Sequence, residues 1–141
     1  LTQVRLRECS VRLNWVPQPR GLLFVRGGEV RLTQVFVNLI NNAVDAMLDQ
    51  SERVIHLEVE QGAARLVVLV RDIGPGLKEP EKVFDPFYST KAVGSSEGMG
   101  LGLSISYGLV QSFGGNIRGS NAAEGALFTV ELDYWKEEDA A

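Results

Sequence analysis

The first half of the chain carries one helical pattern of apolar positions and two strand-like patterns. From Arg31 to about Leu48, apolar residues recur every three or four positions, which is typical of an amphipathic helix. Residues 54–60 alternate between apolar and polar, as in a strand with one solvated face. Residues 65–73 are apolar on both faces, so we expect a central strand of a sheet, with Asp72 directed toward the core.

The second half predicts another helix and a closing hairpin. A helix is expected over residues 102–113, because Gly114 and Gly115 follow it in the position of a C-terminal cap. Residues 116–120 and 126–134 have the pattern of two hairpin strands, and the second strand alternates apolar residues toward the interior. Together with the first helix, these elements predict a two-layer α/β sandwich in which helices cover one face of a mixed sheet.

Four further segments complete this outline. Residues 9–16 and 22–26 are rich in β-branched and aromatic residues, which predicts two early strands in a hairpin or at a sheet edge. Residues 84–99 form a long loop without periodicity, and loops of that length in a compact domain are usually functional or disordered. Residues 136–141 are an acidic tail that we expect to be frayed.

Length and composition restrict the kind of protein. A chain of 141 residues fits one domain, and because it starts at Leu1 rather than Met we interpret it as a fragment of a longer protein. A net charge of −4 without a basic cluster argues against nucleic-acid partners. Cys9 is the single cysteine and cannot form an internal disulfide, which favours a reducing, cytoplasmic setting. The strongly apolar run 66–70 is too short to cross a bilayer, so we expect no direct membrane contact.

A polar stripe follows one flank of the first helix. Gln34, Asn38, Asn42 and Asp45 are spaced by four, four and three positions, which places them beside the apolar face. Asn costs a helix up to about 0.7 kcal/mol relative to Ala, and solvated helix faces are normally built from Glu, Lys and Arg. A ligand site therefore explains the stripe better than a solvated surface. Because Mg prefers hard oxygen ligands, the amide oxygens of Asn38 and Asn42 are candidates to coordinate a Mg ion that bridges phosphates.

Asp72, at the end of the predicted central strand, is a candidate for ligand recognition. An ionised carboxylate without a partner is costly in a buried position, so a hydrogen-bond donor is expected to face it. Gly74 and Gly76 lack Cβ, which permits backbone conformations and close approaches that other residues cannot adopt. A plain Asp-Ile-Gly-Pro-Gly turn after a strand is the alternative interpretation.

A glycine-rich turn precedes the second helix. Gly98, Gly100 and Gly102 leave free backbone N–H groups that can receive phosphate oxygens, aided by the helix dipole. Lys91, in the long loop, can close onto a γ-phosphate as a point charge, although an ordinary exposed lysine is the alternative. The glycine spacing differs from the dinucleotide fingerprint, and the chain lacks GxxxxGK[S/T], HRD and DFG elements, so those nucleotide-binding folds are disfavoured.

Four segments together resemble the ATP-binding catalytic domain of bacterial sensor histidine kinases. They are NLINNA at 38–43, DIGPG at 72–76, FDPFYSTK at 84–91 and GMGLGL at 98–103, and the resemblance covers roughly residues 10–133. The superfamily also holds gyrase, Hsp90 and MutL, and it implies a Bergerat fold: a mixed, mostly antiparallel sheet with helices on one face and a lid over ATP. The loop and second helix are most similar to kinases of the nitrogen-regulation and C4-dicarboxylate sensor type.

The resemblance implies a role for individual residues. Asn42 matches the main protein ligand of Mg, and Asp72 matches the acceptor of a hydrogen bond from the exocyclic amine of adenine, where guanine has a carbonyl. Thr129 matches a hydroxyl that supports this aspartate, and Phe84 and Phe87 match aromatics that anchor the base of the lid. The implied cofactors are ATP and Mg, with ATP held between the first helix and the lid. The implied nucleotide-binding residues are Asn42, Asp45, Asp72, Gly74, Gly76, Phe87, Lys91, Gly98, Gly100, Leu101, Gly102 and Thr129.

Asn38 bears on the choice between a kinase and a self-sufficient ATPase. The gyrase, MutL and Hsp90 branches place a glutamate general base four residues before the metal-binding asparagine, and here that position is Asn38. An amide cannot accept the proton, so we expect slow hydrolysis and transfer of the γ-phosphate to a protein, with Asn38 and Lys91 as the candidate catalytic residues. An ATP-gated module of the gyrase or Hsp90 kind and a degenerate domain that does not bind ATP remain as alternatives.

The phosphoacceptor is expected outside this sequence. His56 is the only histidine, and it belongs to the solvated face of an alternating strand rather than to a helical His-Glu or His-Asp context. We therefore interpret His56 as an inert surface residue. The implied partners are a helical dimerisation domain of the same parent, which carries the acceptor histidine, and the receiver domain of a response regulator. The implied parent is a homodimer, compatible with anchoring in the inner membrane.

Overall fold

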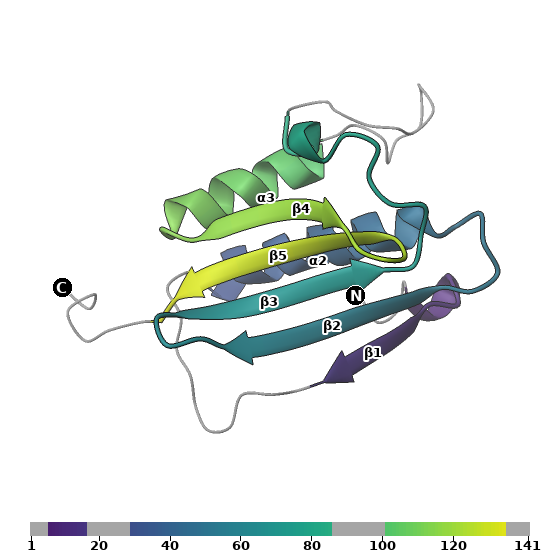
Figure 1. Ribbon diagram of the computed structural model, residues 1–141, viewed down its shortest axis with the longest axis horizontal. Coiled ribbons are helices and arrows are strands. Elements are labelled where there is room, and N and C mark those ends of the chain that lie inside the picture. The colour runs from purple at the N-terminus through teal and green to yellow at the C-terminus, as the bar shows by residue number, and fades with distance from the viewer. Residues whose placement is uncertain (1–5, 17–28, 86–100, 135–141) are drawn as a thin grey trace.

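The computed structural model describes residues 6–16, 29–85 and 101–134. Within these ranges the chain forms a five-stranded sheet and two long helices (Figure 1). The elements in chain order are β1 Arg12–Val16, α2 Glu29–Ala46, β2 Val54–Gln61, β3 Arg65–Asp72, the 3-10 turn η1 Pro80–Lys82, α3 Leu101–Ser112, β4 Asn116–Asn121 and β5 Ala126–Asp133.

The strands follow the order β1-β2-β3-β5-β4 across the sheet, so β3 lies in the middle, as its apolar pattern predicted. β1 pairs parallel with β2, and the other neighbouring pairs are antiparallel. Both α2 and α3 lie behind the sheet in the view of Figure 1, and they pack against each other. The predicted two-layer sandwich with a mixed, mostly antiparallel sheet is confirmed.

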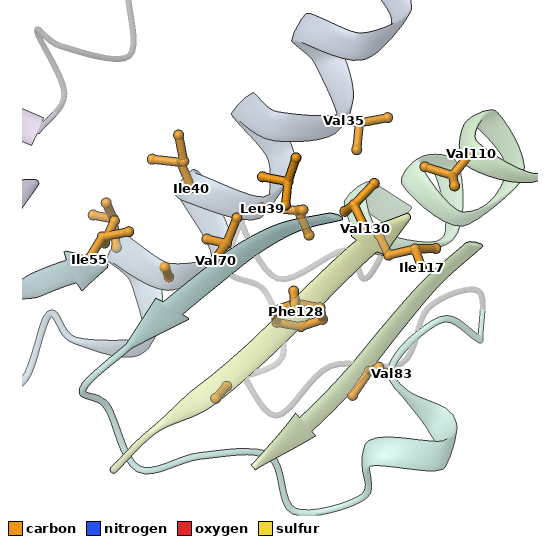
Figure 2. Close-up of a cluster of buried hydrophobic side chains, with 14 of the residues drawn as sticks. Val35, Leu39, Ile40, Ile55, Val70, Val83, Val110, Ile117, Phe128 and Val130 are labelled. Atoms are coloured by element: carbon orange, nitrogen blue, oxygen red, sulfur yellow. The ribbon is translucent and has the colours of Figure 1, made fainter. Parts of the chain in front are cut away.

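The core lies between this sheet and the two helices. Val70 of β3 stands opposite Phe128 of β5, and both side chains are buried. Leu39 of α2 and Val110 of α3 belong to the same cluster (Figure 2). Burial of one aliphatic side chain of this size contributes about 1.5–3 kcal/mol, so the cluster holds both helices to the sheet.

The first helix differs slightly from its predicted limits. It begins at Glu29, two residues before the predicted start. The apolar pattern did not reveal these residues because Val30 is 80% exposed and is not part of the core. It ends at Ala46, where the next amides turn to bonds of the i to i−3 type, from Met47 N to Val44 O and from Leu48 N to Asp45 O. Met47 stays fully buried in that tighter turn, which is why the apolar pattern continued past the end of the helix.

The N-terminal prediction is partly tested. The segment 9–16 contains β1, which lies at the edge of the sheet as expected, and its partner is the parallel strand β2. The second early strand, residues 22–26, lies outside the described residues, and so do the acidic tail and nearly all of the predicted lid.

The second face of the sheet turns away from both helices (Figure 1) and carries ion pairs near its edges. Arg65 pairs with Asp133 at 2.7 Å, and Arg118 pairs with Glu131 at 3.1 Å, each across neighbouring strands. His56 also lies on this face, opposite Arg71, as the alternating pattern of its strand predicted. Within the described ranges, neither long helix has the length and hydropathy that crossing a bilayer requires.

Candidate nucleotide-binding site

The candidate site is built around Asp72, the last residue of the central strand. Its side chain belongs to the core face, and the residue is only 2% exposed. Oδ1 accepts two backbone hydrogen bonds, from Gly74 N at 2.8 Å and from Ala126 N at 3.1 Å. Among the described residues, none donates to Oδ2. One carboxylate oxygen therefore fixes the side chain, and the other is a candidate acceptor for a ligand.

The electrostatic balance at Asp72 follows from this geometry. Burial disfavours the charged carboxylate and raises its pKa from 3.8, while the amides of Gly74 and Ala126 lower it by a smaller amount. A ligand donor directed at Oδ2 would supply a hydrogen bond that the protein withholds. The expectation that Asp72 is buried is confirmed, and the donors that face it within the chain are the amides of Gly74 and Ala126.

Two glycines close tightly around this carboxylate. A Cβ on Gly74 would lie 3.1 Å from the carbonyl oxygen of Ala46, at the end of α2. Gly125, in the turn between β4 and β5, has a φ of +77°, and a Cβ there would lie 2.6 Å from Asp72 Oδ1. Gly125 and Ala126 were not among the predicted site residues. The signal that could have found them is the glycine in the predicted hairpin turn.

Thr129 does not support Asp72, and its assignment from the resemblance is wrong. It stands opposite Leu69 in the pairing of β5 with β3, whereas Val70, on the same face as Asp72, stands opposite Phe128. Thr129 therefore lies on the other face of the sheet. The residue of β5 that contacts the carboxylate is Ala126, through its backbone amide.

The loop after Asp72 is held by the hairpin as well. Gly76 has a φ of +88°, a conformation that favours glycine, as predicted. The next residue, Leu77, makes two backbone hydrogen bonds with the side chain of Asn121, which ends β4. Asn121 was not predicted to belong to the site.

The polar stripe on α2 reaches the start of α3. The Nδ2 atom of Asn38 donates to Gly102 O and to Ser106 Oγ, both at 3.2 Å, and Ser106 Oγ donates to Gly102 O at 2.9 Å. This places Asn38 beside Gly102, the last glycine of the glycine-rich turn, and leaves its carbonyl oxygen Oδ1 as an acceptor. Asn42 and Asp45 are half-buried further along α2.

The remaining predicted residues are only partly described. Phe84, the first residue of the predicted lid (residues 84–99), packs its ring 5.3 Å from that of Tyr107 on α3 and 6.2 Å from that of Phe128, so it anchors the start of the lid. For Leu101 the structure gives the backbone position at the start of α3. Outside the described residues lie Phe87, Lys91, Gly98 and Gly100.

These features define an open-sheet α/β sandwich with a candidate ligand site at the end of its central strand. The chain belongs to the family of histidine kinase-, DNA gyrase B- and HSP90-like ATPases, whose model matches residues 27–136. It is 43% identical to the two-component sensor PprA of Pseudomonas aeruginosa, over 90% of this chain and 14% of that protein. It is 36% identical to the C4-dicarboxylate transport sensor protein DctB of Rhizobium meliloti, over 89% of this chain and 20% of that protein.

The chain thus spans a fifth or less of the length of these two relatives. Solved structures agree with the family. The catalytic domain of the histidine kinase ThkA superposes with a TM-score of 0.78 at 28% identity, over 93% of this chain and 84% of that one. A second structure shows ThkA in complex with the response regulator protein TrrA, and it superposes with a TM-score of 0.76 at 27% identity, over 94% of this chain and 37% of that one.

Proposed function

We propose that this chain binds ATP with Mg and passes the γ-phosphate to a histidine on a helical dimerisation domain of a longer sensor histidine kinase. The observation that carries the proposal is the Asp72 carboxylate, which is buried and held through one oxygen while no described residue donates to the other. Membership of an ATPase family supports the binding of ATP, and the similarity to sensor proteins supports the assignment to a sensor histidine kinase.

Asp72 is the recognition element for the base. Its open oxygen, Oδ2, accepts a hydrogen bond from the exocyclic amine of adenine, whereas guanine would present a carbonyl and leave two acceptors facing each other. Gly74 and Gly76 allow the backbone to approach the base closely. The fixed position of Oδ1 keeps the carboxylate in one orientation, which makes the discrimination strict.

The phosphates lie toward the start of α3. Asn42 and Asn38, the latter through its Oδ1, are the residues that would hold a Mg ion, with Asp45 one turn further along α2. Two amide oxygens would fill only part of the coordination shell of Mg, so most of the ligands would be phosphate and water oxygens, as Mg prefers. When bound, Mg supplies neutralisation of the phosphate charge. Gly98, Gly100, Leu101 and Gly102 contribute backbone amides, Phe87 anchors the lid, and Lys91 closes on the γ-phosphate.

Asn38 makes the domain a phosphoryl donor to another protein domain rather than an ATPase that hydrolyses ATP by itself. Its amide cannot take a proton from water, and its Nδ2 already donates to the start of α3. The acceptor is a histidine of the parent's dimerisation domain, because His56 lies on the second face of the sheet, the face opposite to Asp72. We place the reaction in the cytoplasm, in a homodimer that then phosphorylates a response regulator.

The test of nucleotide binding compares two changes of the same chemistry. Asp72→Asn replaces the acceptor by an amide, and we expect the affinity for Mg-ATP to fall about 10- to 100-fold, because a hydrogen bond to a charged group is worth ~1.5–3 kcal/mol. Asp133→Asn, on the second face of the sheet, is the matched control and is expected to bind like the wild type. Calorimetric titration measures both. An unchanged affinity of Asp72→Asn would remove Asp72 from the site.

The test of phosphotransfer adds an acceptor. With a helical hairpin that carries the His-Glu motif supplied in trans, we expect acid-labile phosphorylation of the hairpin and slow release of phosphate without it. Rapid hydrolysis by the chain alone would favour the gyrase or Hsp90 type of ATPase. Absence of binding would favour a degenerate domain.

A further inference from the structure

We propose that Asn121 is a positioning residue for adenine, which sets the preference for this base by fixing the loop of residues 73–77. The proposal rests on the proposed function, since it concerns the same pocket. The side-chain amide of Asn121 is bonded to Leu77 through both of its ends. It acts through Leu77, and its effect is on the shape of the backbone that the base contacts.

Both ends of the Asn121 amide are engaged by one residue. Oδ1 accepts a hydrogen bond from Leu77 N at 2.6 Å, and Nδ2 donates to Leu77 O at 3.0 Å. Two hydrogen bonds to one residue fix its orientation as well as its place, as a strand partner would. The residues are 44 positions apart, so the side chain replaces a backbone pairing that the chain does not form.

The glycines around this contact fit the same role. A Cβ on Gly76 would lie 2.8 Å from Asn121 Oδ1, so the amide occupies the space that a side chain at position 76 would need. A Cβ on Gly119 would lie 3.2 Å from Leu77 Cδ1, which shows that the Leu77 side chain packs directly over β4. Leu77 is therefore held by its backbone and by its side chain.

One pair of opposite residues in the β4–β5 hairpin binds both ends of the loop of residues 73–77. Asn121 stands directly opposite Ala126 in the pairing of β4 with β5. Ala126 N donates to Asp72 Oδ1 at 3.1 Å, where the loop begins, and Asn121 binds Leu77, where it ends. From the other side, Gln50 Nε2 donates to Ile73 O at 3.0 Å. The loop is thus held by three contacts, from Ala126, Asn121 and Gln50.

This arrangement affects recognition because the loop itself is weakly constrained. It contains Gly74 and Gly76, which without outside contacts would sample many conformations on either side of Pro75. Discrimination between bases depends on an unfavourable pairing that the site cannot relax, so it requires a rigid frame. Loss of the Asn121 contacts leaves Asp72 in place but frees the far end of the loop, and both adenine affinity and discrimination against guanine decrease.

The experiment measures displacement of a labelled adenine nucleotide from the 141-residue chain by Mg-ATP and by Mg-GTP. For Asn121→Ala we expect the affinity for ATP to fall about tenfold, as the loss of two hydrogen bonds near the surface predicts. The affinity for GTP should change little, so the ratio of the ATP affinity to the GTP affinity should decrease. Asn121→Asp keeps the acceptor for Leu77 N and loses the donor, and it should retain part of the ratio. Asn116→Ala, at the opposite end of β4, is the matched control and should match the wild type.

The possible outcomes separate this inference from the proposed function. If the wild type binds ATP and Asn121→Ala keeps both the ATP affinity and the ATP-to-GTP affinity ratio, even with a lower melting temperature, then Asn121 is merely structural. In that case this inference fails and the proposed function stands. If the wild type binds no ATP, the proposed function fails and the inference fails with it. A decreased ATP-to-GTP affinity ratio in Asn121→Ala, with the same melting temperature as Asn116→Ala, supports both the inference and the proposed function.

Discussion

Asp72 is held in place by two backbone amides yet has lost nearly all of its contact with water, and the effect of burial is the larger one, so its pKa is raised. A position of this kind does not serve stability. The ionised carboxylate destabilises the folded chain, and only a ligand that donates to Oδ2 turns the same charge into a favourable contact.

The raised pKa gives a pH dependence with a definite sign. The protonated carboxyl is the form that folding prefers, so its stabilising contribution is complete below 3.8, the usual value, and is lost as pH rises through the raised value of the folded state. The free energy of unfolding of Asp72→Asn should therefore exceed that of the wild type at neutral pH, and the excess should disappear on acidification below 3.8.

Urea denaturation of both chains across this pH series measures the excess. A difference that is independent of pH would contradict the raised pKa. Adenine binding has the opposite requirement, because only the ionised carboxylate is a pure acceptor, so ATP affinity should weaken as the pH falls through the same window.

The element that shapes the site is the β4–β5 hairpin, and its turn glycine is the most constrained point. Gly125→Ala forces a side chain into a φ of +77° and to within 2.6 Å of Asp72 Oδ1. We expect the free energy of unfolding to fall by at least ~1–2 kcal/mol, the cost of the left-handed conformation alone, and ATP binding to be lost with the displaced carboxylate.

Gly108→Ala is the control for this change. Gly108 lies within α3, and a Cβ there meets no atom within 4 Å. The same substitution should stabilise the chain by about 0.5–1 kcal/mol, because Ala restricts the unfolded state and favours the helix. Thermal denaturation of the two variants gives shifts of opposite sign, and a loss of stability in both would show that the turn has no special constraint.

At the scale of the whole molecule, one core joins the sheet to both helices, so a cavity in the core should lower the stability of the whole domain. Leu39 is fully buried in the core of Figure 2, whereas Leu48, just past the same helix, is 39% exposed. Leu39→Ala should lower the free energy of unfolding by about 2–5 kcal/mol, and Leu48→Ala should lower it much less.

Chemical denaturation followed by circular dichroism and by tryptophan fluorescence tests this prediction. Coincident transitions shifted by the same amount for Leu39→Ala would show that the domain unfolds as a unit. Equal losses for the two leucine variants would contradict the assigned core.

The sequence pattern predicted the sheet, both helices and Asp72, because period-two and helical repeats depend on local spacing and on which side is buried. The same alternation could have corrected Thr129: residues 126, 128 and 130 lie on the face that packs against the helices, so residue 129 lies on the opposite face of the sheet. Asn121 could not be found this way. Its partner Leu77 is set by the strand register and by the path of the loop, which no local pattern encodes.

The contact between Ala126 and Asp72 also fixes when the pocket can exist. The two residues are 54 positions apart, and β3 receives β5 as its neighbour only after β4 has been made. During synthesis on the ribosome, the base site therefore stays incomplete until the chain has been extended past Ala126. A nascent N-terminal half, although it already contains Asp72 and the asparagines of α2, would lack the proposed adenine site.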